Sequence, residues 1–318
     1  MKKLFSVILI SSILCYFTEV TALVIPEPWI YSTVYIANLS TNKAGTGFLV
    51  SRQIEEKSQK IFLISNKHVL TPRPLKNEPG ENKEAKAKVK LNRTREGKLE
   101  LFEIEVILRE ASGKELFIGH PNKEIDVAAL DFTTYISENR QLKPDLKLGF
   151  IPEDRLATKE ILRQQFVSIG DRVVVLGYPL NLVEGGHCIP IARDGVIATA
   201  PELDFKDLPI ILIDSTMVRG SSGSPVFLPV LPYKFTSAKD IDQLQVTQAS
   251  VLGVVSKLVP DWEMEIKKTI TYGGEPESVS VITVANMGVI FRAETIKETI
   301  DQFIPAWVPN SKDKETGK

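Results

Sequence analysis

The amino-acid sequence predicts an all-β fold built from barrels or sandwiches. Most of the chain consists of short segments that are rich in β-branched or aromatic residues and bounded by Gly, Pro, Asn or charged residues. These segments fall into two sets along the chain, and helical periodicity is sparse. Short strands separated by turn residues at this spacing are typical of barrels and sandwiches.

The two sets of predicted strands are separated near residues 142–155, where Pro144 and Pro152 interrupt the pattern. We therefore predict two units, residues 23–150 and residues 151–305. The first set covers residues 32–37, 45–51, 61–65, 87–93, 99–108 and 125–132. The second set covers residues 172–176, 189–198, 210–213, 225–228, 250–255 and 279–285.

Two further segments have the spacing of amphipathic helices. Apolar residues recur at helical intervals in residues 158–166 and again in residues 293–303. The second segment lies shortly before a polar C-terminal stretch, so we expect residues 306–318 to form a disordered tail.

The N-terminus has the features of a signal peptide. Lys2 and Lys3 precede an apolar stretch, residues 4–17, and residues 20–22 form a small-residue cleavage pattern. We expect cleavage after Ala22 and a secreted or periplasmic protein, with an uncleaved N-terminal anchor as the alternative. Cys15 would leave with residues 1–22, so the processed chain would keep only Cys188 and no intramolecular disulfide.

The composition indicates a sizeable core and no marked charge. Of the 318 residues, 43% are hydrophobic and 25% are charged, and the formal net charge is −1. This length is enough for one large core or for two small domains that share an interface. Because no basic surplus points to nucleic acid or to an anionic membrane, we predict neither as a partner of the processed chain.

A serine in a glycine-rich segment is the first candidate for chemistry. The segment reads Gly220-Ser221-Ser222-Gly223-Ser224-Pro225. A nucleophilic serine needs its own N–H, and the N–H two residues earlier, directed at the point where an oxyanion forms. Gly220 and Ser222 are placed to supply this oxyanion hole. A Ser/Gly turn without chemistry is the alternative interpretation.

A histidine and an aspartate upstream of the serine complete a possible triad. His68 follows the predicted strand 61–65, where a strand end would leave it accessible. Asp126 begins an apolar run, and a carboxylate there is costly to bury unless it is hydrogen-bonded. An imidazole partner would offset that cost and fix the histidine tautomer. A surface histidine and a turn aspartate are the alternatives.

Together these three segments resemble those of the trypsin-like, chymotrypsin-fold serine peptidases. That family has T-N-x-H-V, D-[IL]-A-[VL]-L and G-[ND]-S-G-[GS]-P around its catalytic residues. This chain has S-N-K-H-V, D-V-A-A-L and G-S-S-G-S-P, in the same order. Residues 45–50, 170–179 and 194–197 add to the similarity, which runs from about Val34 to Ile300. The bacterial and broadly distributed members fit best, because the processed chain has no disulfide pair.

The resemblance implies two six-stranded antiparallel β-barrels with the active site between them and a short C-terminal helix. It implies that His68, Asp126 and Ser222 form the catalytic triad of a serine endopeptidase that works through an acyl-enzyme. Protein or peptide substrates are then the expected partners. Neither an organic cofactor nor a metal ion is expected.

The family pattern also bears on the acid of the triad. Asp131 flanks the same apolar run as Asp126, and in a regular strand residues five apart point to opposite faces. Only one of them can then meet His68. The family places the acid just before the apolar pair, which matches Asp126.

The chain departs from the family in positions that set specificity. Ser221 stands where the family usually has Asp or Asn, and the bulky Arg219 precedes the oxyanion-hole glycine. The residue six before the nucleophile often forms the floor of the substrate pocket, and here it is Thr216. Because Thr216 is not acidic, we do not expect a preference for Arg or Lys.

Two other readings of the serine motif lead to different functions. An α/β-hydrolase needs a strand-to-helix turn and a histidine after the serine, whereas His68 precedes Ser222 and a predicted strand follows it. We reject that class. A catalytically silent fold that acts as a peptide- or protein-binding module remains the alternative function.

Overall fold

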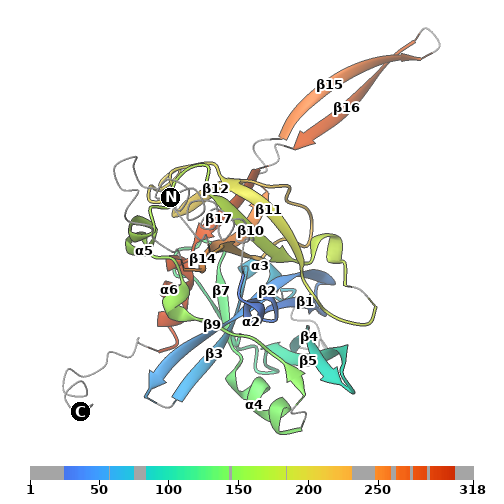
Figure 1. Cartoon of the computed structure of the whole chain (residues 1–318). Helices are drawn as coiled ribbons and strands as arrows, with labels where there is room; N and C mark the ends of the chain where they lie inside the picture. Colours follow the sequence, from blue (N-terminus) through green and yellow to red (C-terminus); the bar gives the residue numbers. More distant parts are fainter. Residues whose placement is uncertain are drawn as a thin grey trace, which may run out of the picture.

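The computed structural model describes most of the chain, and it confirms the all-β prediction. The described residues are 25–56, 58–74, 84–142, 145–183, 185–230, 248–258, 263–272, 275–284 and 287–304. They form a nine-stranded sheet, a closed six-stranded barrel and a two-stranded sheet (Figure 1). The predicted signal peptide, residues 1–22, and the predicted tail, residues 306–318, lie outside the described residues.

The first sheet contains nine strands instead of the predicted six. Its main path runs through β5 (Lys98–Arg109), β4 (Ala85–Arg95), β1 (Thr33–Asn38), β2 (Lys43–Glu55), β3 (Ser58–Ser65), β7 (Ala128–Asp131) and β6 (Phe117–Gly119). The short strands β8 (Leu146–Lys147) and β9 (Ile151–Pro152) pair with β4 and β2. Strands this short are fixed by pairing with longer neighbours, because they hold too few residues to show alternation.

The second sheet is the closed barrel, with the predicted number of strands. It follows the order β10 (Arg172–Gly177), β11 (Ile191–Ile197), β12 (Ile210–Asp214), β17 (Met287–Arg292), β14 (Ser250–Leu258) and β13 (Pro225–Leu228). β15 (Glu263–Tyr272) and β16 (Glu275–Val284) pair with each other as an antiparallel hairpin, which extends away from the barrel in Figure 1.

The described helices are short and include both predicted ones. These are α5 (Lys159–Gln164) and α6 (Glu294–Asp301), and α6 is the short C-terminal helix. Thr158 caps α5, because its hydroxyl accepts a hydrogen bond from the backbone N–H of Ile161 at 3.4 Å. α4 (Thr133–Leu142) was not predicted, because its residues are mostly polar. The other helices are α2 (Glu27–Ile30) and α3 (Lys67–Leu70), with 3₁₀ turns at Glu153–Arg155 and Pro179–Asn181.

Three apolar clusters make up the core. One fills the first sheet around Leu49 and Leu63, and another fills the barrel around Val175 and Ile213. The third contains residues of both sheets and of α6, among them Phe48, Phe62, Phe227, Phe291 and Ile300. Because this shared cluster excludes water between the two sheets, burial of apolar surface fixes one sheet against the other.

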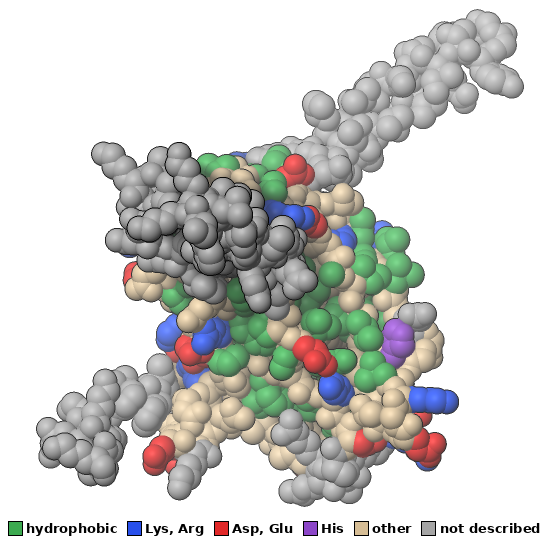
Figure 2. All heavy atoms as spheres, viewed as in Figure 1, with side chains coloured by type: hydrophobic (Ala, Val, Ile, Leu, Met, Phe, Trp, Pro, Cys, Tyr) green, Lys and Arg blue, Asp and Glu red, His purple; other side chains and the backbone are tan. Residues whose placement is uncertain are grey.

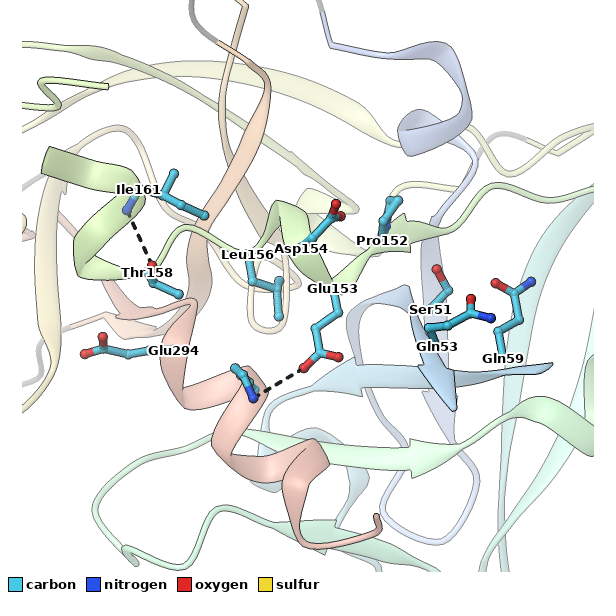
Figure 3. A pocket seen from close by; sticks show the side chains of 11 residues that line it. Ser51, Gln53, Gln59, Pro152, Glu153, Asp154, Leu156, Thr158, Ile161 and Glu294 are labelled. Atoms are coloured by element: carbon cyan, nitrogen blue, oxygen red, sulfur yellow. Dashed lines mark hydrogen bonds and ion pairs between the residues drawn. The ribbon is translucent and has the colours of Figure 1, made fainter. Parts of the chain in front are cut away.

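A buried ion-pair network closes the same junction on one side. Arg52 in β2 is almost fully buried and binds Glu153 with two nitrogens, while its Nη2 also lies 2.5 Å from Asp301 of α6. The Arg52 Nη1 donates to the carbonyl of Ile304 at 2.7 Å. Glu153 also forms an ion pair with Lys297 Nζ at 3.8 Å, and both side chains line a cavity of about 640 Å³ that is lined by none of the predicted catalytic residues (Figure 3).

The surface shows no gathering of one charge on the face seen in Figure 2. Small groups of Lys, Arg, Asp and Glu side chains are scattered over that face, and hydrophobic side chains lie between them across its middle. Among the described residues, no helix is long and apolar enough to cross a membrane.

Arg52→Met should lower the free energy of unfolding by roughly 3 kcal/mol, because it removes the buried cation of Glu153 and leaves only the more exposed Lys297 beside that carboxylate. The matched control is Arg172→Met, which removes an ion pair to Asp194 in which both side chains are more than half exposed. The control should cost less than about 1 kcal/mol. Urea unfolding of both variants decides between them. Equal losses would show that the Arg52 network does not join the two sheets.

Candidate active site

His68 and Asp126 lie in direct contact at the end of the first sheet. His68 belongs to α3, the one-turn helix that follows β3, and its Nδ1 lies 2.5 Å from Asp126 Oδ2. The other carboxylate oxygen of Asp126 accepts the backbone N–H of His68 at 3.1 Å. With Asp126 ionised, Nδ1 carries the proton and Nε2 is left as an acceptor.

The two candidate acids have different partners. Asp131 lies at the end of β7, where its carboxylate accepts Lys60 Nζ at 2.8 Å and Thr133 N at 3.1 Å, and these hydrogen bonds lower its pKa against the opposing effect of burial. Asp126 lies before β7, which begins at Ala128 and not at residue 125. The alternation argument therefore does not apply to Asp126, and its position depends on the bend ahead of the strand.

Buried asparagines hold the histidine helix from both ends. The side-chain amide of Asn38 in β1 donates to the carbonyl oxygens of Val69 at 3.0 Å and Thr71 at 3.1 Å. Asn66, which precedes α3, donates from Nδ2 to the carbonyl of Asp126 at 2.6 Å. A helix of one turn has no stability of its own, so these bonds determine where His68 points.

Residues 220–224, which precede β13 and are called the serine loop below, contact β2 through Thr46. The N–H of Thr46 donates to the carbonyl of Ser222 at 2.9 Å, and its hydroxyl donates to the carbonyl of Gly220 at 3.0 Å. The same hydroxyl accepts the N–H of Tyr178 at 3.1 Å. Gly223 has φ +82°, and a Cβ there would lie 2.0 Å from the Thr46 carbonyl. Only glycine at position 223 permits this approach.

This docking brings Ser222 beside the histidine helix. A Cβ built on Gly45 would lie 3.1 Å from Ser222 O and 2.8 Å from Val69 Cγ2, so Gly45 separates the serine loop from the residue next to His68. Within the described part of the chain, no hydrogen bond joins Ser222 Oγ to the His68 ring. In serine-type sites this bond often tightens only when substrate is present.

Within residues 220–224, two backbone N–H groups have no acceptor among the described residues. They belong to Gly220 and Ser222, whereas the intervening Ser221 N donates to Val218 O at 3.0 Å and Gly223 N donates to Val255 O at 2.9 Å. Gly220 has φ +91° and is buried. This pattern leaves available the two donors that an oxyanion hole needs.

Thr216, the predicted floor of the substrate pocket, is exposed at the edge of the serine loop. Its carbonyl accepts a hydrogen bond from the guanidinium of Arg193, which also donates to Ser221 Oγ at 2.6 Å. Burial lowers the pKa of Arg193. Arg219, the bulky residue that precedes the oxyanion-hole glycine, is exposed. Its carbonyl accepts the N–H of Leu180.

A cavity of about 780 Å³ opens beside His68 and Asp126. It is lined by more basic than acidic side chains, since Lys43, Lys67, Arg73 and Lys123 face it along with Glu124 and Asp126. Burial lowers the pKa of Lys67, and the charge of Asp126 opposes that effect.

The remaining histidines do not gather into a metal site. His120 Nε2 lies 2.7 Å from Glu298 Oε2 of α6, and its Nδ1 accepts the N–H of Asn122 at 3.1 Å. Within the ranges that the structure describes, no group of three His, Cys, Asp or Glu residues is arranged to hold a metal ion.

Sequence reasoning missed three residues that shape the site: Asn38, Thr46 and Arg193. The glycines on both sides of Thr46 were a usable signal, because they indicate close backbone contact at that strand. Asn38 and Arg193 gave none, since each acts on a segment remote in the chain.

Gly220→Ala should destabilise the protein by about 3 kcal/mol or more, because the positive φ and the lack of space add up. A Cβ at this position would lie 2.3 Å from the carbonyl of Tyr178. Gly170→Ala is the matched control: φ is +88° there, and a Cβ would meet nothing within 4 Å. The control should lose only about 1–2 kcal/mol in urea unfolding. Equal losses would mean that the Gly220 backbone has room to move.

Comparison with known proteins shows the family of the chain. The family described as trypsin-like peptidase domain matches residues 45–229. Among solved structures, the chain is similar to the one titled "Crystal structure of Deg5", with 16% sequence identity, a TM-score of 0.42, and coverage of 73% of this chain and 81% of that chain. No curated protein matches the chain. Since the matched region extends from the strand before His68 to beyond Ser222, the chain belongs to the trypsin-like peptidase domain family.

Proposed function

We propose that this protein is an exported serine endopeptidase that cleaves peptide bonds through an acyl-enzyme on Ser222. Membership of a peptidase family supports a protease-type function. The observation that carries the finer proposal is the contact of 2.5 Å between His68 Nδ1 and Asp126 Oδ2, on a helix that packs beside the serine loop.

In the first half of the reaction, His68 acts as general base. Its Nε2 accepts the proton of Ser222 Oγ as that oxygen attacks the carbonyl carbon of the scissile peptide bond. Asp126 orients the imidazole and stabilises the imidazolium that forms. The N–H groups of Gly220 and Ser222 stabilise the negative oxygen of the tetrahedral intermediate.

In the second half, the imidazolium of His68 gives its proton to the leaving amine, and the C–N bond breaks. The acyl group stays on Ser222 as an ester. A water molecule then attacks this ester with His68 again as base, which releases the acid product and restores the serine. All proton transfers use His68, so the proposed reaction requires no metal or organic cofactor.

Export and the substrate class follow from other features. The proposed signal peptide, residues 1–22, would direct the chain to a secreted or periplasmic location. Protein or peptide substrates are the proposed partners. The basic residues around the His68 cavity and the cation behind Thr216 make a site that disfavours positive charge.

The processed protein should react with a fluorophosphonate probe at Ser222, because the probe needs a serine activated by a neighbouring base. Mass spectrometry of the labelled peptide identifies the residue, and Ser224→Ala, which removes another hydroxyl of the same loop, is the control. Labelling should disappear in Ser222→Ala and persist in the control. A folded protein without label at Ser222 would favour the catalytically silent binding module.

Asp126→Asn should reduce turnover by roughly four orders of magnitude, since it removes the charge that fixes the imidazole tautomer. Asp131→Asn removes a carboxylate from the same strand region but leaves the His68 contact intact, so its turnover should stay within a few-fold of the unmodified protein. Steady-state kinetics are compared after circular dichroism has shown that both variants fold. Collapse of Asp131→Asn with near-normal Asp126→Asn would overturn the assignment.

Peptide-library digestion should show that cleavage after Arg or Lys is not the main activity. With Thr216 at the proposed floor, a cationic side chain finds no acidic partner and loses its hydration. We expect kcat/KM for peptides with Arg or Lys before the scissile bond to be at least about tenfold lower than for neutral ones. Ser222→Ala serves as the blank. A library cleaved chiefly after Arg or Lys would show that the pocket assignment is wrong.

A further inference from the structure

Arg193 is an unusual cation for its position. It lies in β11, two strand periods from Ile197, whose side chain is buried in the barrel core, so both side chains point to the inner face of the barrel. The guanidinium is partly buried, and burial lowers its pKa. Among the residues that the structure describes, it forms no ion pair with a carboxylate. A desolvated cation of this kind is costly unless neutral acceptors satisfy it.

Those acceptors all belong to the segment that leads into the nucleophile. Arg193 Nη1 donates to the carbonyl of Thr216, and Nη2 donates to Ser221 Oγ at 2.6 Å. Nη2 also lies 3.8 Å from the sulfur of Met217. The planar guanidinium of Arg193 is therefore hydrogen-bonded to the first and the last residue of the segment 216–221.

Several hydrogen bonds of this segment converge on Ser221. Its side chain is almost fully buried, its Oγ also accepts the N–H of Val218 at 3.3 Å, and its own N–H donates to the carbonyl of Val218 at 3.0 Å. Ser221 lies between Gly220 and Ser222, whose N–H groups have no acceptor in the part of the chain that the structure describes. A rotation of its backbone would turn the 221–222 peptide plane and move the Ser222 N–H away from the Gly220 N–H.

We propose that Arg193 is a positioning residue that holds residues 216–221 in the conformation in which the N–H groups of Gly220 and Ser222 converge. This inference rests on the function proposed above. The related peptidases usually carry a carboxylate or amide at the position of Ser221. In this chain the position holds a neutral hydroxyl, to which Arg193 of β11 donates a hydrogen bond.

Arg193→Gln is the first test. Loss of a single oxyanion-hole donor costs about 10²–10³ in kcat, so loosening both donors should lower kcat by roughly a hundredfold with little change in KM. Affinity for a peptide boronic acid, which occupies the oxyanion hole, should fall in parallel. Arg193→Lys should recover part of the loss, because an ammonium group reaches one acceptor but lacks the planar fork. Arg172→Gln, an exposed ion-pair partner on the adjacent strand, is the control for general effects on the barrel.

The same substitution made in the Ser221→Asp variant distinguishes a positioning role of Arg193 from a direct contact of Arg193 with substrate. In Ser221→Asp, the carboxylate would accept a charge-assisted bond from Arg193, so adding Arg193→Gln should cost more in kcat than it does with Ser221 present. If Arg193 instead bound substrate, its loss would raise KM with kcat unchanged, independently of residue 221. That result, or a fall in kcat no larger than in Arg172→Gln, would overturn the proposal.

Hydrogen exchange distinguishes a failure of this inference from a failure of the proposed function. Peptides that contain residues 216–222 should exchange faster in Arg193→Gln, while peptides from β12 and β17 should be unaffected. This readout does not depend on catalysis. If the unmodified protein gives no fluorophosphonate label but exchange still rises, the function fails and the positioning role stands. Unchanged exchange in 216–222 together with unchanged kcat would refute the role of Arg193 itself.

Discussion

The pair of hydrogen bonds from Thr46 to the serine loop is the interaction on which the site depends. Its N–H and hydroxyl bind the carbonyls of Ser222 and Gly220, residues of the loop that precedes β13 in the barrel. β2, which contains Thr46, pairs with β3, and β3 leads directly into the histidine helix. His68 and Ser222, the proposed base and nucleophile, are thereby both positioned relative to β2, although His68 follows a strand of the first sheet and Ser222 lies in a loop of the barrel.

Such a junction is reliable only if the two sheets cannot slide. The shared apolar cluster around Phe48 and Phe227 prevents this, because any displacement would expose buried surface or open a cavity. Arg52 adds direction to this non-directional force by joining β2 to Glu153 and to α6. The geometry of the candidate site is therefore a consequence of packing over the whole interface, with polar contacts selecting one register.

Charge has a different role near His68 and near the serine loop. On the His68 side, a carboxylate fixes a tautomer and would stabilise a transient imidazolium. Near the serine loop, Arg193 contacts only neutral acceptors among the described residues, which keeps negative charge away from the place where an oxyanion would form. The positive groups near His68 and near Thr216 would stabilise developing negative charge and would disfavour cationic substrates.

The sequence by itself determined the fold class, most strands, both amphipathic helices and the family. All of these depend on local information: alternation with a period of two, helical spacing, turn residues and three short motifs in order. It did not determine the nine strands of the first sheet, the helix α4, or the start of β7 after Asp126. These features depend on contacts with neighbouring segments, and short or polar segments carry no periodicity from which such contacts could be predicted.

Only the tertiary structure decided how the candidate residues meet. Asp126 and His68 are 58 residues apart in the chain, and Thr46 and Gly220 are 174 apart. No periodicity spans such distances, so the motifs predict which residues carry chemistry but not what holds them. The contacts of Asn38, Thr46 and Arg193 exist because closing one sheet and packing it on the other brings remote backbone groups together, where each buried donor must find an acceptor.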